Sequence, residues 1–153
     1  MVPNQINRNL IKETVQLMIG LVIKHRKVMQ HYLQETGVYQ AQHHLLMKIS
    51  HNRYASQKEL AESMEVSTAT IAVSLKKLEK GGYIKKIMDE EDNRLNQIII
   101  TEKGNKVVEQ SKQIFESVDQ KLFDGFTEKE LSTLSSLLRK LDSNLARMEE
   151  EIK

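Results

Sequence analysis

The 153-residue sequence contains no cysteine and no long apolar run. Without cysteine the chain can form no disulfide, no thiolate nucleophile, no cysteine-ligated zinc site and no thiol-based peroxide sensor. No stretch approaches the roughly 20 apolar residues that a membrane-spanning helix requires, and the opening residues 1–9 are polar with a single proline. These absences favour a cytoplasmic protein with no membrane partner.

The motifs of common enzyme classes are also missing. The sequence has no nucleotide-binding glycine-rich loop and no Gly-x-Ser-x-Gly nucleophile turn. None of its histidines pair at i, i+4 spacing, and adjacent His43 and His44 point to different faces of a helix. We therefore predict no enzyme, no cofactor and no metal site. Metal sensing stays open as an alternative, because histidine and glutamate can bind zinc without cysteine; the histidines are His25, His31, His43, His44 and His51.

Charge is nearly balanced overall but concentrated locally. The chain is 39% apolar and 29% charged, as in ordinary globular proteins, and its net charge is +2. Between Val66 and Met88, however, five lysines stand against one glutamate, which gives this segment a local charge of +4. We expect a compact basic face there. Its lysines are Lys76, Lys77, Lys80, Lys85 and Lys86.

Apolar side chains recur at the helical period of about 3.6 residues in the first third of the chain. The period predicts a long amphipathic helix over Asn9–Leu33, which ends at Thr36-Gly37. It resumes over Val38–Ile49, where it predicts a second helix.

Two short helices are predicted next. Ser56 and Glu59 have the spacing of a capping box, so a third helix begins at Ser56 and extends to about Glu65. After Val66-Ser67 a fourth apolar period turns Ile71, Leu75 and Leu78 inward. Two short helices that meet at a tight turn predict a helix-turn-helix, although any helical hairpin would give the same pattern.

A β-hairpin is predicted after the fourth helix. Gly81-Gly82 ends that helix, and Tyr83–Met88 and Leu95–Ile100 flank a charged, turn-rich segment. β-branched residues around such a segment are typical of a hairpin. The order of elements is that of a winged helix, so we predict a mainly α fold with a small β-hairpin wing between long N- and C-terminal helices.

The last third of the sequence predicts two more helices. Thr101 is the expected N-cap of a fifth helix ending near Gly125, and Thr127 with Glu130 forms a capping box that begins a sixth. The sixth carries an unbroken heptad of apolar residues, which requires a facing helix. That partner is either the fifth helix or a second copy, and we predict self-association. The predicted dimerisation residues are Leu10, Leu131, Leu134, Leu138, Leu141, Leu145 and Met148.

The segment Ser56–Gly104 resembles the DNA-binding core of the MarR family of winged-helix transcriptional regulators. Its most specific part is DNRLNQIIITEKG. The family's wing has an Asp and an Arg separated by one residue, then a strand that ends in a Thr-Glu-Lys-Gly-like helix start, and here these are Asp92, Arg94 and Thr101–Gly104. The chain departs from the family at Ala72 and Val73, where a polar residue and an arginine are common.

The resemblance implies one domain over residues 1–153, with a DNA-binding region at about 38–104 and dimerisation helices at about 9–33 and 105–153. It also implies double-stranded DNA as a partner, a homodimer, repression and release by a small-molecule effector. The effector pocket would lie between the dimer helices and the winged head. The residues assigned to it are His25, Met29, Tyr32, Tyr39, His43 and Leu46.

Side-chain chemistry assigns roles within the DNA-binding region. The N-terminal end of a recognition helix faces base edges in the major groove. Here it carries small side chains, whose hydroxyls can bond bases or phosphates and whose methyl groups can contact thymine, so we expect an A·T-rich site. Lysines further along contact phosphates. The assigned residues are Ser67, Thr68, Thr70, Ala72, Val73, Lys76, Lys77, Lys85 and Lys86.

The wing contributes a separate contact. Arg94 is predicted to enter the minor groove, where a cation is attracted most strongly if the groove is narrow, as in A-tracts. Asp92, two residues away, would hold its guanidinium by a bidentate pair. Two such heads joined in a dimer would read a palindrome, with half-sites roughly 34–36 Å apart. The alternative is a winged-helix module that binds protein without specific DNA binding.

Overall fold

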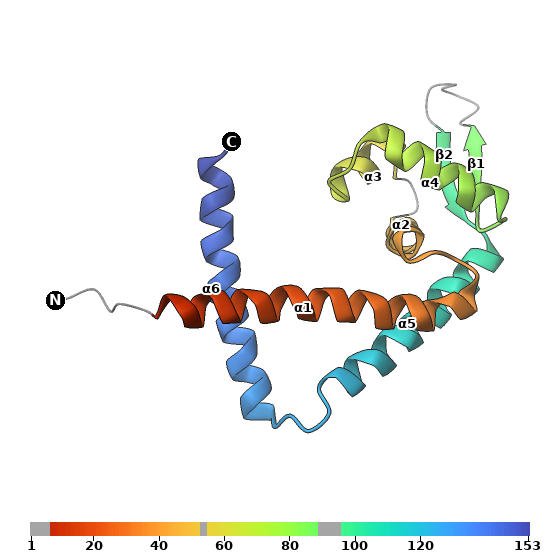
Figure 1. Ribbon diagram of the computed structural model, residues 1–153. Helices are drawn as coiled ribbons and strands as arrows, with labels where there is room; N and C mark the ends of the chain where they lie inside the picture. Colours follow the sequence, from red (N-terminus) through yellow and green to blue (C-terminus); the bar gives the residue numbers. More distant parts are fainter. Residues whose placement is uncertain (1–6, 53–54, 89–95) are drawn as a thin grey trace. The chain divides into compact units, whose positions relative to one another are not determined.

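The computed structural model describes residues 7–52, 55–88 and 96–153. Within these residues the chain is mainly helical with one antiparallel hairpin, which confirms the predicted fold class. The chain divides into two compact units, residues 1–115 and 116–153. The elements in chain order (Figure 1) are α1 (Arg8–Leu33), a 3-10 turn η1 (Gln34–Thr36), α2 (Gln40–His51), α3 (Gln57–Ser63), α4 (Thr68–Lys80), β1 (Ile84–Met88), β2 (Asn96–Ile100), α5 (Glu102–Leu122) and α6 (Glu128–Glu151).

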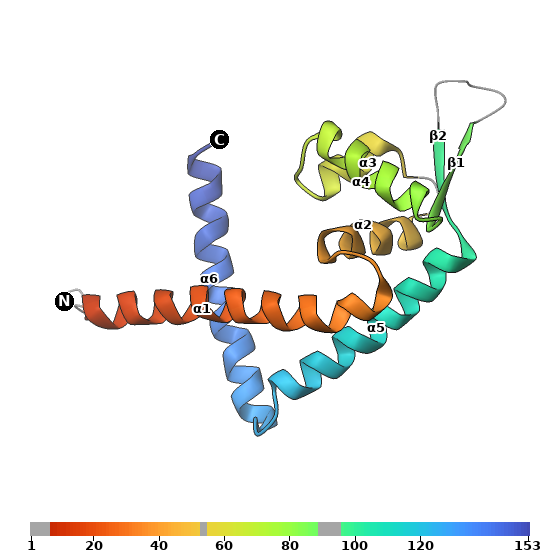
Figure 2. The same cartoon turned by 45° about the vertical axis from the view of Figure 1, so that its right-hand side comes forward.

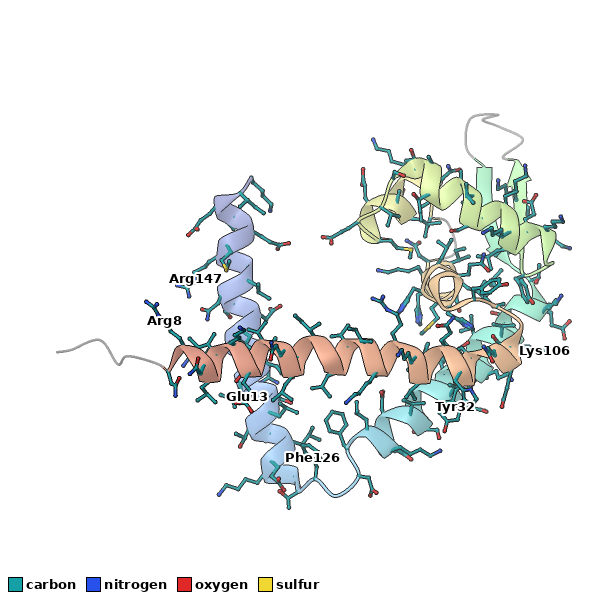
Figure 3. The ribbon with its side chains drawn as sticks, in the orientation of Figure 1. Arg8, Glu13, Tyr32, Lys106, Phe126 and Arg147 are labelled. Atoms are coloured by element: carbon teal, nitrogen blue, oxygen red, sulfur yellow. The ribbon has the colours of Figure 1, made fainter. Side chains whose placement is uncertain are left out.

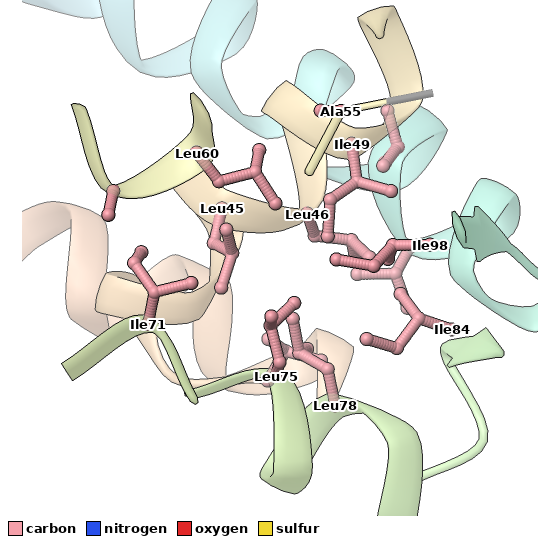
Figure 4. Close-up of a cluster of buried hydrophobic side chains, with 14 residues drawn as sticks. Leu45, Leu46, Ile49, Ala55, Leu60, Ile71, Leu75, Leu78, Ile84 and Ile98 are labelled. Atoms are coloured by element: carbon pink, nitrogen blue, oxygen red, sulfur yellow. The ribbon is translucent and has the colours of Figure 1, made fainter. Parts of the chain in front are cut away.

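The core of the first unit lies among α2, α3, α4, the hairpin and the start of α5. Figures 1 and 2 show α3 and α4 stacked over α2, with the hairpin beside the end of α4. Each fully buried Leu or Ile contributes about 1.5–3 kcal/mol relative to an exposed one, so this cluster fixes α4 against the rest of the head. Its large members (Figure 4) are Leu45, Leu46, Ile49, Leu60, Ile71, Leu75, Leu78, Ile84 and Ile98.

The helix starts follow the capping residues. Ser56 Oγ accepts a hydrogen bond from Glu59 N at 3.1 Å. Thr127 forms the complete capping box: its hydroxyl accepts from Glu130 N, and the Glu130 carboxylate accepts from Thr127 N. Thr101 Oγ1 accepts from Gly104 N at 3.1 Å. The predicted starts of α3, α5 and α6 are therefore confirmed.

Two predicted helix ends differ from the structure. The second helix begins at Gln40 because Val38 is buried in the core and Tyr39 is extended, at the N-cap position. The third helix ends at Ser63, because Glu65 adopts a left-handed φ of 54° in the turn before α4. A left-handed residue cannot continue a right-handed helix.

The terminal helices bury little. Among the described residues, α6 has none that is buried, and α1 buries only Met29 and Leu33 at its C-terminal end. No helix in the described part of the chain is both long and apolar enough to cross a lipid bilayer.

Candidate nucleic-acid interface

The first turn of α4 is held by hydrogen bonds from both sides. Ser67 Oγ accepts from Thr70 N at 3.1 Å, and the Ser67 and Thr70 hydroxyls are bonded to each other at 2.8 Å. The Gln57 side chain, at the start of α3, donates to the Thr68 carbonyl at 3.1 Å. The position of α4 is thus fixed by α3, and two of its small polar side chains are engaged in its own cap.

One face of α4 is buried and the opposite face is open to solvent. Ile71, Leu75 and Leu78 point into the core. The open face is apolar near the start of the helix, where Val73 is 56% exposed, and basic toward its end. Ala72 is half-buried at the edge of this face. The exposed residues of this face are Ala69, Thr70, Val73, Lys76, Lys77 and Lys80.

The lysines of α4 form a basic surface that no described carboxylate neutralises by an ion pair. An ion pair between described residues joins Lys106 and Glu102 on α5, and it involves none of these lysines. The described acid nearest in sequence, Glu79, lies on the same helix but is not bonded to Lys76, Lys77 or Lys80. A surface of this kind suits a polyanion, whose phosphates would supply the missing negative charges.

The wing is a short antiparallel hairpin in which Lys85 pairs with Ile99 and Lys86 with Ile98. Successive residues of a strand point to opposite faces, so the two lysines lie on opposite faces of the hairpin. Both are exposed. They therefore cannot contact the same row of phosphates from the same side.

The hairpin tip at 89–95 lies outside the described residues. Arg94 and Asp92, which the sequence assigned to the minor-groove contact, belong to this segment, so their roles stay predictions.

A set of contacts that we name the clasp fixes the hairpin to the start of α5. Thr101 donates from its hydroxyl to the Gly82 carbonyl at 2.6 Å and from its backbone N to the Tyr83 carbonyl at 3.0 Å. Lys103 Nζ donates to the Gly81 carbonyl at 2.7 Å and lies 4.6 Å from the centre of the Tyr83 ring. The clasp joins the end of α4, the base of the wing and α5, which gives Thr101 and Lys103 of the Thr-Glu-Lys-Gly motif a structural role.

His43 forms a buried polar contact between α2, η1 and α5. Its ring is 1% exposed, with Nε2 at 2.9 Å from the Val38 carbonyl and 3.0 Å from the Thr36 hydroxyl. Because a carbonyl only accepts, Nε2 carries the proton. Nδ1 lies 2.8 Å from the Ser111 hydroxyl oxygen, which itself donates to the Val107 carbonyl at 2.7 Å. Burial lowers the pKa of His43 below 6.5, partly offset by the Val38 carbonyl, while nearby His44 lowers it further.

This depressed pKa predicts a loss of stability in acid. Above pH 6.5 the imidazole is neutral in the folded and unfolded states; below it, the unfolded state takes up the proton more readily than the folded state. As the pH drops below 6.5, His43 should therefore lower the free energy of unfolding by up to about 1.4 kcal/mol for each pH unit. Urea unfolding of the wild type and His43→Gln across pH 5 to 8 measures it. Equal pH slopes in the two proteins would contradict the prediction.

The predicted effector residues differ in burial, and their role stays a prediction. Met29, His43 and Leu46 are buried, whereas His25 and Tyr39 are exposed and Tyr32 is at the boundary of exposure. A hollow of about 320 Å³ lies where α1 passes into α2, and of the predicted set only Tyr39 lines it. The lining residues are Gln30, Gln34, Gly37, Val38 and Tyr39.

No cluster of three or more His, Asp or Glu side chains suited to a metal ion occurs in residues 7–52, 55–88 and 96–153. His43 uses both ring nitrogens in the contacts described above.

Both terminal helices expose apolar side chains along their length. On α6 the heptad residues Leu138 and Leu145 are 50% and 58% exposed. On α1, a helix of 26 residues and about 39 Å, apolar side chains project in several directions (Figure 3). Isolated exposed apolar residues are common, but series of this length are typical of a surface that another chain covers.

Sequence reasoning missed several residues of this site. Ala69 is exposed one turn before Val73, a position that follows from the helical period once the buried face is known. Lys80 was counted in the basic segment but not assigned a contact. The Lys103 and Ser111 contacts join residues 22 and 68 positions apart, and no local pattern predicts them.

Residues 38–95 match the MarR family. The uncharacterized HTH-type transcriptional regulator YybA of Bacillus subtilis (strain 168) is 35% identical over 108 residues, which are 71% of this chain and 72% of that protein.

Solved structures agree in fold. A crystal structure of a MarR family transcription regulator gives a TM-score of 0.85 at 17% identity, over 94% of this chain and 95% of that one. A mutant MarR from E. coli, crystallised with operator DNA, gives a TM-score of 0.73 at 24% identity, over 87% of this chain and 96% of that one. The sequence identity to YybA extends over more than two thirds of both proteins, and so the chain belongs to the MarR family of HTH-type transcriptional regulators.

Proposed function

We propose that this protein is a homodimeric repressor that binds operator DNA with the open face of α4 in the major groove and the wing against the adjacent minor groove. The observation that carries the proposal is the face of α4 opposite the core, where small side chains precede Lys76, Lys77 and Lys80. The operator-bound E. coli relative has the same fold, which supports this placement. We further propose that the protein is cytoplasmic, because it must act in the compartment that contains the DNA.

In this proposal, dimerisation is required for recognition of the operator sequence. The exposed apolar series of α6 and α1 would pack against a second copy, together with α5. Two-fold symmetry would then present two α4 helices to half-sites roughly 34–36 Å apart, and the operator would be a palindrome.

Effector control would act on the same assembly. The hollow beside Gln30, Gln34 and Tyr39 has the volume of a small-molecule site and offers two amides and a phenol to a polar ligand. An effector releases DNA only if it binds the non-DNA arrangement of the two heads more tightly than the DNA-bound one.

The test of DNA binding uses Lys76→Ala with Lys77→Ala. Each phosphate contact contributes about 0.9 to the slope of log affinity against log salt, so removing four lysines per dimer should lower that slope by about 3 to 4. Fluorescence anisotropy with a duplex recovered by selecting bound genomic fragments measures the slope. The matched control is Lys106→Ala with Lys112→Ala, which removes the same charge from exposed positions of α5 and should change the slope far less.

The second candidate function is a winged-helix module that binds protein. It is favoured by the apolar exposure of Val73 within the open face of α4. In that case the wild type would prefer no duplex sequence, and the lysine variant would lose no specific DNA binding. A steep, lysine-dependent salt slope on the selected duplex excludes this alternative.

A further inference from the structure

We propose that Val73 and Ala69 are the specificity-determining residues of α4, and that they read the 5-methyl groups of thymines in the major groove. The proposal rests on the DNA-binding function proposed above and names what the site recognises. It concerns the base edges, whereas the lysines contact phosphates that carry no sequence information.

The packing of the head leaves Val73 outside the buried core. Ile71, Leu75 and Leu78 supply the buried face of α4, and Val73 lies on the opposite side with more than half of its surface open. Ala69 precedes it by four residues and is also exposed, so the two side chains lie one above the other on the same face. The sequence-based candidate Ala72 is half-buried at the edge and contributes less.

The first turns of α4 offer few polar side chains that could form hydrogen bonds with base edges. The Ser67 and Thr70 hydroxyls are bonded to each other, and Ser67 also accepts from Thr70 N, so the cap already uses much of their hydrogen-bonding capacity. From Thr68 to Leu75 the helix has no Arg, Lys, Asn or Gln that could make a bidentate contact to a purine. The first long polar side chain, Lys76, lies about 12 Å along the helix from Thr68.

The surrounding charge identifies the occupant as nucleic acid. Lys76, Lys77 and Lys80 share the open face with Val73 and would engage the phosphates on either side of a groove. The one methyl group that a major groove offers is the C5-methyl of thymine, and the other groups by which the base pairs are distinguished there are hydrogen-bond donors and acceptors. An apolar patch bordered by lysines therefore fits a thymine-containing groove.

The test is a double-mutant cycle that combines one protein variant with one base analogue. The probe is the duplex recovered from bound genomic fragments, synthesised with thymine, with deoxyuridine in place of thymine in the half-sites only, or with deoxyuridine in the flanks only. Uracil keeps the pairing and the minor-groove edge of thymine and lacks only the methyl group. Affinities of the wild type and Val73→Ala are measured by fluorescence anisotropy.

For the wild type, each lost methyl contact should weaken binding about fourfold, so half-site uracil should cost about tenfold or more per dimer, and flank uracil should cost nothing. Val73→Ala should bind the thymine duplex more weakly and lose clearly less on half-site uracil. Equal wild-type affinity for thymine and half-site uracil duplexes would overturn the proposal. So would equal losses in both proteins, because they would indicate a change in DNA shape. If genomic selection recovers no preferred fragment, the proposed DNA-binding function itself fails.

Discussion

Leu138→Glu combined with Leu145→Glu should convert the proposed dimer to monomers and abolish tight operator binding. Both side chains belong to the heptad series of α6, are half-exposed in the single chain, and would be covered by a second copy. A carboxylate buried there without a partner loses its hydration, and the energetic cost exceeds the apolar area removed. Linked heads gain roughly 10²–10⁴ in affinity over a single head, so the monomer should lose a factor of this size.

Sedimentation velocity and operator titration on the same samples measure the two losses. The matched control is Ser136→Glu with Ser143→Glu, which adds the same charge on the opposite face of α6, where both residues are exposed. It should stay dimeric and bind DNA. If the leucine variant remains dimeric with unchanged affinity, the α6 series does not form the dimer interface.

Gly104→Ala should reduce the free energy of unfolding by about 2–4 kcal/mol. A Cβ at this position would overlap the Tyr83 carbonyl oxygen and approach Ile100 Cγ1 to 2.7 Å. Backbone cannot move aside as a flexible side chain can. The shift would break the bond from Thr101 N to the Tyr83 carbonyl and open the clasp between the wing and α5.

Urea unfolding at one fixed protein concentration measures this effect, since the stability of a dimer depends on concentration. Asn105→Ala is the matched control: it places alanine at the next position, which is exposed, and should change stability by less than about 0.5 kcal/mol. If the Gly104→Ala protein is as stable as the control, the close approach of Tyr83 does not require glycine at position 104.

Local patterns in the sequence predicted the elements of the fold well. The apolar period placed the first helix over Asn9–Leu33, and α1 is Arg8–Leu33. The Thr127 capping box and the Thr101 cap were also predicted, because a cap involves residues three positions apart. The end of α3 was wrong by two residues, because the left-handed Glu65 has no sequence signal comparable to glycine.

Contacts between distant segments could not be predicted in the same way. The assignment of His43 to an effector pocket stays a prediction, and its buried contact with Ser111, 68 residues away, was not foreseen. The open face of α4 was predicted only in part, although its local signature was present. The apolar period correctly turned Ile71, Leu75 and Leu78 inward, and the exposure of Ala69 on the opposite side follows from the same period.

Hydroxyl-radical footprinting of the wild-type protein on a selected genomic fragment tests the central claim most directly. In the proposed dimer, two heads joined through α1, α5 and α6 should protect two half-sites centred about 10 base pairs apart, in a symmetric pattern. One isolated protected patch would contradict a symmetric dimer that reads a palindrome. Uniform protection independent of sequence would contradict specific recognition by α4.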